Sequence, residues 1–163
     1  MTVNRGEEPP PAMSASAELR KLAGLVGVWE STAKYRFTPK GEIFDSKSVD
    51  VITWSPNQQY LITDQRGLTP EGWKNQLIIT RWNPAKKEYA LVLFPPDGEI
   101  VQPTMIIEGA IRKTLYYRSF GGRLIRSEIT QEDISPTEYK FRCECTDEGA
   151  SWVYCEGIAR KTR

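Results

Sequence analysis

Short runs of alternating apolar and polar residues fill the chain from residue 27 onward, and turn residues separate them. The runs are rich in Val, Ile, Thr, Tyr, Phe and Trp, which favour strands. They predict ten strands, over 27–37, 42–54, 58–67, 75–82, 87–94, 102–108, 113–120, 123–131, 137–146 and 150–161. The connections are too short for crossover helices, so consecutive strands are expected to pair antiparallel in a meander.

The predicted fold class is all-β. The main question is whether the sheet closes into a barrel. An open meander leaves two unpaired edges, which closing into an up-and-down barrel removes. A two-sheet sandwich would bury the same apolar faces and is the alternative. Because a barrel of about eight strands can already hold one small ligand, a ten-stranded barrel predicts an internal cavity.

The N-terminal residues differ from the rest of the chain. Residues 1–15 are rich in proline, glycine and small polar residues and predict a flexible tail. Residues 16–24 predict one short helix, with Ser16 as N-cap and Gly24 at its end. Residues 16–163 then form a single domain. The tail has no apolar core of a secretory signal, which predicts a cytoplasmic protein.

Composition narrows the function classes. The 163 residues are 39% hydrophobic, enough for the core of a folded domain, yet no apolar run is long enough to span a membrane. With 22 basic and 21 acidic residues, the chain has no strong field for nucleic acid or a membrane surface. It contains no histidine, which excludes His-based triads and His-ligated zinc or haem. We therefore expect no metal and no cofactor, and the oligomeric state is not indicated.

Three cysteines, Cys143, Cys145 and Cys155, lie close to the C-terminus. Their odd number excludes a complete disulfide framework. Cys143 and Cys145 have the spacing that places two thiols on one face of a strand. The interpretation is three free thiols packed as small apolar groups. The alternative is a cross-strand disulfide between Cys155 and either of the other two.

One motif resembles a known family. Gly27-Val28-Trp29 resembles the G-x-W signature that opens the first strand of lipocalins and their calycin relatives. The last predicted strand carries Arg160 where calycins place an arginine over that tryptophan. Residues 54–62 and 81–89 also resemble a group of uncharacterised bacterial lipocalin-like domains. The resemblance covers residues 19–161, and extends distantly to nitrobindins and fatty-acid-binding proteins.

The resemblance implies a calycin-type barrel that binds a small hydrophobic or amphipathic molecule. It also implies that Trp29 and Arg160 form a structural plug at one barrel end, through stacking of the cation over the indole. Nitrobindins bind haem through a histidine, which this chain lacks, so haem binding is not carried over.

Two candidate cavity residues follow from alternation along single strands. If Trp29 faces inward, the period of two places Tyr35 inside as well. Arg81 shares a face with the apolar Leu77 and Ile79, which predicts that it faces inward too. The alternative for Arg81 is a strand-end arginine that reaches water.

A hairpin supplies the remaining candidates. Gly121-Gly122 fits a two-residue type I′ turn, which pairs Tyr117 with Arg126. Tyr117, Arg126 and Glu128 then share one face and predict a polar end of the cavity that prefers an acceptor or anionic group. The opposite face carries Tyr116, Arg118 and Ile125, and the sequence does not decide which face is inside.

Binding of a small hydrophobic or amphipathic molecule without catalysis is the predicted function. The alternative is a small acid–base enzyme, of the isomerase, cyclase or decarboxylase type, that uses a carboxylate and a tyrosine inside the barrel. No nucleophile–base pair can be recognised from spacing. A third possibility is an interaction module with a filled core.

Overall fold

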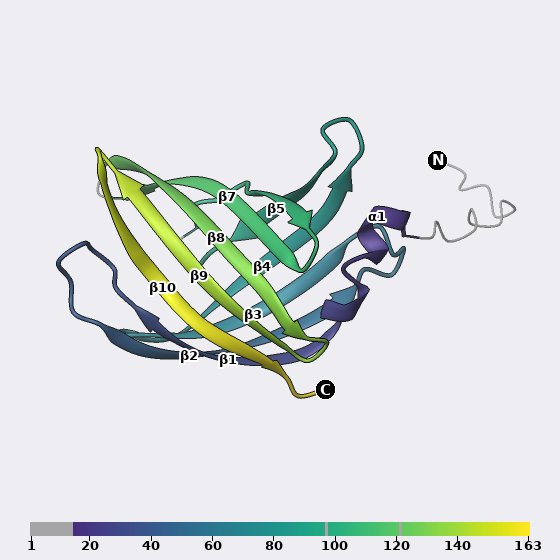
Figure 1. Cartoon of the computed structure of the whole chain (residues 1–163), viewed down its shortest axis with the longest axis horizontal. Coiled ribbons are helices and arrows are strands. Elements are labelled where there is room, and N and C mark those ends of the chain that lie inside the picture. Colours follow the sequence, from purple (N-terminus) through teal and green to yellow (C-terminus); the bar gives the residue numbers. More distant parts are fainter. Residues whose placement is uncertain (1–14, 97, 121) are drawn as a thin grey trace, which may run out of the picture.

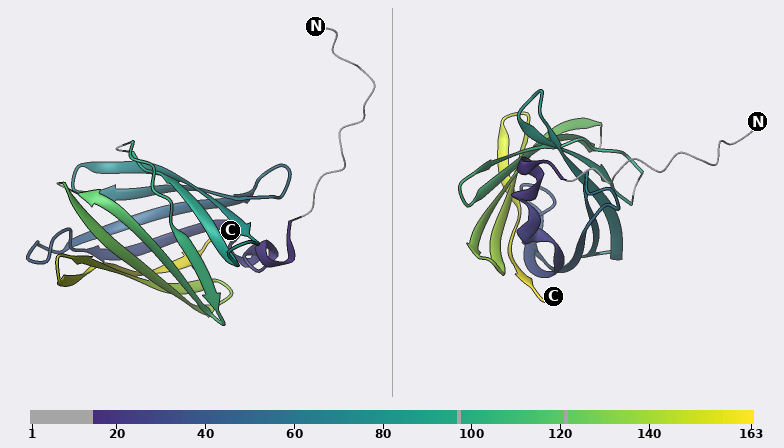
Figure 2. Two further views of the ribbon diagram at one scale, coloured as in Figure 1. Left: turned by 90° about the horizontal axis from the view of Figure 1, so that it is seen from above. Right: turned by 90° about the vertical axis from the view of Figure 1, so that its right-hand side faces the viewer.

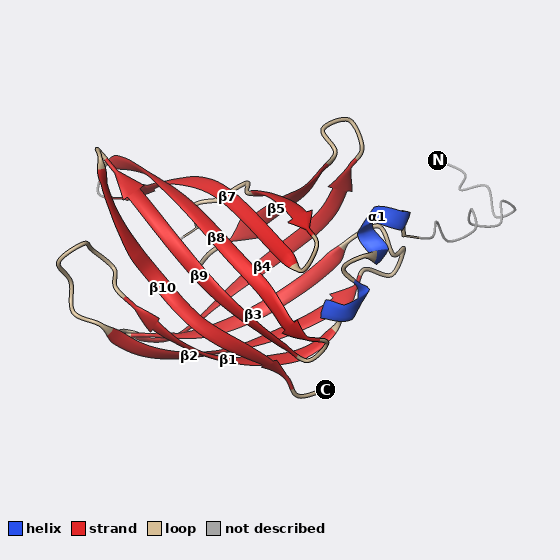
Figure 3. Ribbon diagram, in the orientation of Figure 1, coloured by secondary structure: helices blue, strands red, loops and turns tan. Residues whose placement is uncertain are grey.

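Ten antiparallel strands form a closed barrel in the order β1-β10-β9-β8-β7-β6-β5-β4-β3-β2 (Figures 1 and 3). The computed structural model describes residues 15–96, 98–120 and 122–163. The strands are β1 (Gly27–Tyr35), β2 (Phe44–Trp54), β3 (Leu61–Thr69), β4 (Gly72–Asn83), β5 (Glu88–Phe94), β6 (Thr104–Glu108), β7 (Ile111–Phe120), β8 (Arg123–Ser135), β9 (Glu138–Asp147) and β10 (Ala150–Lys161). The up-and-down barrel is confirmed over the sandwich.

The barrel closes between its first and last strands. In this seam Trp29 lies opposite Lys161 and Ala33 lies opposite Gly157. A Cβ on Gly157 would lie 2.3 Å from the carbonyl oxygen of Thr32 and 2.8 Å from both Ala33 Cβ and Phe141 Cζ. The missing side chain therefore permits the close approach of β1 and β10.

Alternation along β9 shows which side of the wall is inside. Tyr139, Cys143 and Cys145 are buried, whereas the charged residues between them are exposed. Since side chains on a strand alternate between the two faces, charged residues cover the outside and apolar residues line the inside of this wall. Cross-strand pairing carries the same assignment around the barrel.

Helices α1 (Ala17–Arg20) and η1 (Ala23–Leu25) lie across one barrel end (Figure 2). The Ser16 side chain accepts a hydrogen bond from the Leu19 N–H, as the N-cap prediction requires. The α-helix ends at Arg20, earlier than predicted, because Leu22 turns to become buried and Gly24 lies in the 3-10 turn.

The predicted flexible tail lies mostly outside the described residues. Its last residue, Ala15, is 5% exposed and packs in the core, so the tail prediction is wrong at this position. In the part of the chain that the structure describes, no helix has the length and apolar character needed to cross a membrane.

Trp29 is the centre of the core at the α1 end. Its indole N–H donates to the carbonyl oxygen of Leu25 (2.8 Å), and its ring lies 5.0 Å from that of Tyr139. Buried residues from α1 and several strands pack around it, including Leu19, Leu22 and Tyr89. This end of the barrel is therefore closed by packing.

The cation at this plug is Lys161, and the prediction of Arg160 is wrong. The Lys161 Nζ lies 5.8 Å from the Trp29 ring centroid and donates to the carbonyl oxygen of Gly24 (3.0 Å). Ala159 is buried inside, so alternation turns Arg160 outward, where it pairs with Glu138 (2.6 Å). The register Trp29–Lys161 places the lysine instead of the arginine next to the indole.

Paired charge removals test this assignment. Lys161→Met keeps the aliphatic stem but removes the cation and its hydrogen bond, so we expect a loss of about 1 kcal/mol in the free energy of unfolding. Arg160→Met removes an exposed ion pair, and we expect a change within about 0.5 kcal/mol. Urea denaturation of both variants measures the difference. A larger loss of stability for Arg160→Met than for Lys161→Met would show that Arg160 is the cation of the plug.

Candidate ligand-binding site inside the barrel

The β7–β8 hairpin has the predicted register and its inner face is now defined. Tyr117 lies opposite Arg126, and Arg118 lies opposite Ile125. Ile125 is 3% exposed and belongs to the core, whereas Tyr117 is 54% exposed. The face that carries Arg118 therefore lines the barrel interior. The turn prediction rests partly on Gly121, which lies outside the described residues.

The predicted polar cavity end at Tyr117, Arg126 and Glu128 is wrong, because all three lie on the outer face. Arg126 pairs there with Glu128 (2.6 Å), and both side chains are about two-fifths exposed, at 43% and 41%. Glu128 lies opposite Glu144 in the charged outer face of β9. The apolar inner face of β9 forces this orientation on its neighbour β8.

Arg81 is also outside, and the prediction that it faces inward is wrong. It is exposed, while Thr80 and its inward-facing neighbours in β4, Ile78 and Trp82, are buried or partly buried. The apolar residues that share the face of Arg81 are themselves partly exposed, such as Leu77 at 38%. Arg81 is expected to face inward if the apolar residues on its face form an inner face, whereas they lie on the outside of the barrel.

Tyr35 faces inward, as alternation from Trp29 predicts. Its ring meets that of Tyr154 edge-on at 5.5 Å, and burial raises the pKa of its phenol. Its role in binding a ligand stays a prediction.

Arg118 is the inward-facing cation near the end of the barrel opposite α1. Its guanidinium lies over the Tyr154 ring, 4.6 Å from the centroid. Its Nε is buried and has no hydrogen-bond partner. None of the described carboxylates forms an ion pair with it; Asp147, on the inner face two strands away, pairs with Arg123 (2.9 Å). The wall of the barrel thus presents an arginine without a counter-charge.

Among the described residues, most of the buried side-chain atoms that lack a hydrogen-bond partner are donors. Four buried side-chain atoms lack a partner there: Arg36 Nε, Arg112 Nη2, Arg118 Nε and Asp147 Oδ1. Three of these are guanidinium nitrogens, which can only donate. A buried donor without an acceptor is costly, and a ligand that supplies acceptor oxygens would remove that cost.

The groups around Arg118 are neutral. Burial raises the pKa of the Tyr116 and Tyr154 phenols. The three cysteines are free and buried, which confirms the packed-thiol interpretation. At Cys143, the hydrogen bond with Cys145 lowers the thiol pKa, but the bond with Cys155 and burial outweigh it and raise the pKa to about 12. The Cys143 thiol therefore does not neutralise Arg118.

A second polar group crosses the inner face of β2, β3 and β4. Gln76 Nε2 donates to Gln65 Oε1, and Gln65 Nε2 donates to Asp50 Oδ1 (2.8 Å). Ser48 lies next to Asp50 and bonds to Ser31 (2.7 Å between hydroxyls). Burial raises the pKa of Asp50 to about 6, although the hydrogen bonds from Gln65 and Ser48 oppose the shift. These side chains keep partial solvent exposure.

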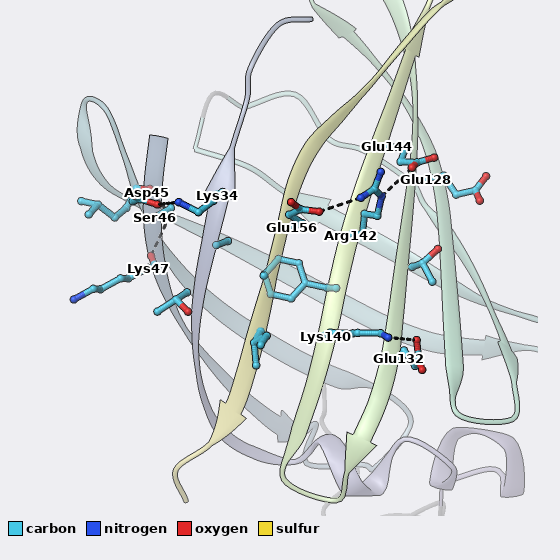
Figure 4. A pocket seen from close by; sticks show the side chains of 17 residues that line it. Lys34, Asp45, Ser46, Lys47, Glu128, Glu132, Lys140, Arg142, Glu144 and Glu156 are labelled. Carbon is cyan, nitrogen blue, oxygen red and sulfur yellow. Dashed lines mark hydrogen bonds and ion pairs between the residues drawn. The ribbon is translucent and has the colours of Figure 1, made fainter. Parts of the chain in front are cut away.

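A groove of about 930 Å³ also lies on the outside of the barrel, over β8, β9, β10, β1 and β2. Figure 4 shows Arg142 there between Glu144 (2.9 Å) and Glu156 (3.0 Å). Lys34 pairs with Asp45 and Lys140 pairs with Glu132 in the same groove. The charges named here are therefore already paired with one another.

Comparisons with known proteins agree on the fold. A scan of protein-family models and a search of curated proteins found no match. The chain resembles the crystal structure of Rv2717c from M. tuberculosis, with a TM-score of 0.65 and 14% sequence identity over 92% of this chain and 100% of that one. It also resembles the S-type phycobiliprotein lyase CPES from Guillardia theta, with a TM-score of 0.60 and 9% identity over 91% and 94% of the two chains. At these identities the likeness shows the fold alone, a closed antiparallel β-barrel.

The sequence analysis did not select Asp50, and it left Arg118 on a face of undecided orientation. A signal for Arg118 existed in β9, where Tyr139, Phe141, Cys143 and Cys145 alternate with charged residues. Carrying that alternation through β8 to β7 places Arg118 inside. Asp50 had no comparable local signal, because β2 alternates weakly between polar and apolar residues.

The raised pKa of Asp50 predicts a pH-dependent cost to stability. The folded-state pKa of about 6 lies above the ordinary value of 3.8 for an aspartate, so the folded protein holds this proton more tightly than the unfolded chain. Stability therefore falls as pH rises from about 4 to 6, and the loss is complete above that range. Asp50→Asn keeps an acceptor for Gln65 and removes the charge, and we expect it to raise the free energy of unfolding by about 1–3 kcal/mol at pH 8.

Urea denaturation at pH 8 and pH 4 measures this difference. At pH 4 the gain should be close to zero. Asp64→Asn, on the neighbouring strand but exposed outside, is the matched control and should show neither the gain nor its pH dependence. A destabilised Asp50→Asn at pH 8 would contradict the buried-charge interpretation.

Proposed function

We propose that the protein binds a small amphipathic molecule inside the barrel, with an anionic group at Arg118. The observation that carries this proposal is the buried, unpartnered Nε of an arginine that no described carboxylate pairs with. A carboxylate or phosphate would supply both the missing acceptor and the missing charge. The apolar remainder of the ligand would lie along inward-facing residues such as Ile78 and Ile129.

The position of Arg118 supports a site near the end of the barrel opposite α1, beside a second packed cluster that includes Trp152 and Tyr154. The α1 end is closed by Trp29 and the residues packed on it. Arg118 lies two residues before the end of β7, on the side where the β7–β8 turn lies. A ligand bound there would place its anionic group at this end and direct its apolar part toward the α1 end.

The fold neighbours are compatible with binding and name no ligand for this chain. The alternative function, an acid–base enzyme, is not better supported than ligand binding. Asp50, the acid with the raised pKa, is hydrogen-bonded to the uncharged Gln65 and Ser48. The inner tyrosines have pKa values raised further by burial, which opposes loss of their protons.

Displacement of a fluorescent fatty-acid probe by a fatty acid and by the alcohol of the same length tests the proposal. In the wild type, the acid should bind about tenfold more tightly or better, since a hydrogen bond to a charged group contributes about 1.5–3 kcal/mol. Arg118→Met keeps the aliphatic stem and should remove the preference for the acid while the alcohol still binds.

Arg126→Met is the matched control, because it removes an arginine from the outer face of the same hairpin. It should leave both affinities unchanged. Equal affinity for the two headgroups in the wild type, or the same effect from both variants, would reject Arg118 as the anion site.

A further inference from the structure

We propose a second subsite at Asp50, on the floor of the barrel, that takes a hydroxyl group at the end of the ligand remote from its anion. The inference rests on the proposed function and deepens it. It narrows the ligand class from amphipathic acids in general to acids that carry a hydrogen-bond donor far along the chain.

The position of Asp50 in the barrel is the first support. Asp50 lies opposite Trp29 in the β1–β2 ladder, and Trp29 belongs to the packed plug at the α1 end. The Tyr139 ring is tilted against that of Trp29, with centroids 5.0 Å apart. Burial is the larger cause that raises the pKa of its phenol, and the Asp50 carboxylate raises it further. Arg118 lies toward the opposite end. The two groups therefore lie toward opposite ends of the barrel.

The direction of the hydrogen bonds is the second support. Gln76 donates to Gln65, and Gln65 donates to Asp50 Oδ1. Both amides are thus oriented by the chain, with the carboxylate as the final acceptor. Asp50 Oδ2 accepts no hydrogen bond from the described residues. Because Oδ2 is not among the buried atoms that lack a partner, solvent reaches it, and a ligand hydroxyl can donate to it in place of water.

The charges that face Asp50 from the surrounding elements do not replace such a donor. Arg112 on β7 lies over the Tyr139 ring, 5.0 Å from its centroid, and pairs with Asp133 (2.7 Å). The neighbours of Asp50 on β1 and β2, Ser31 and Ser48, are neutral and bond to each other. A ligand hydroxyl donating to Oδ2 would stabilise the ionised carboxylate without bringing a second charge into the barrel.

The experiment compares ω-hydroxy fatty acids with ω-methoxy acids of matched length, by displacement of the same fluorescent probe at pH 8. The methoxy group accepts hydrogen bonds but cannot donate them. In the wild type, the hydroxy acid of best length should bind about tenfold more tightly than its methoxy partner. In Asp50→Asn, Gln65 still donates to the side-chain oxygen of residue 50. The new NH₂ group then faces the ligand, so the preference for the hydroxy acid should disappear or reverse.

Asp64→Asn, on the outer face of β3, should keep the wild-type preference and serves as the control. Circular dichroism and urea denaturation verify that each variant is folded. Equal binding of hydroxy and methoxy acids by the wild type, or a preference that survives Asp50→Asn, would overturn the subsite. If plain fatty acids still bind in an Arg118-dependent way in that case, the proposed function stands without the subsite. If no acid displaces the probe, both are overturned.

Discussion

Closure of the sheet between β1 and β10 is the constraint on which the rest of the structure depends. The seam has no room for a side chain at Gly157, where a Cβ would lie 2.3 Å from a backbone carbonyl oxygen. Once the seam is closed, each of the described strands has a hydrogen-bonded neighbour on both sides. Each side chain must then point either to solvent or to a shared interior, so the orientation of one strand determines that of all others.

The interior that results carries charged groups toward both ends and further buried polar side chains, such as Thr114 and Ser127, between them. One end is filled by Trp29 and its neighbours, with Asp50 above this floor. The other end carries Arg118 over Tyr154. A core selected only for stability would avoid a buried arginine without a counter-charge and a carboxylate whose pKa is raised to about 6. Polar groups that reduce stability in this way are typical of sites that complete themselves with a ligand.

Strand count, barrel class and hairpin register were predictable because each depends on local signals. Alternation and turn residues define the ten strands, and the pairing of Tyr117 with Arg126 follows from where the turn lies. The inside of the barrel was harder to predict, because it depends on all strands together. Leu77 and Ile79 form an apolar face in β4 that lies outside, so a rule applied to one strand placed Arg81 wrongly. The plug shows the same limit: motif position indicated Arg160, whereas register and alternation place Lys161 beside Trp29.

The buried Nε–H of Arg118 offers the most direct test of a ligand anion inside the barrel. Its resonance can be followed in ¹⁵N–¹H spectra during titration with a fatty acid, and assigned through its loss in Arg118→Met. If the carboxylate bonds to this group, the Nε–H signal shifts with saturation of the site and becomes protected from exchange with solvent, while the alcohol of equal length leaves it unchanged. A fatty acid that binds without moving this signal, or an alcohol that moves it equally, would contradict an anion site at Arg118.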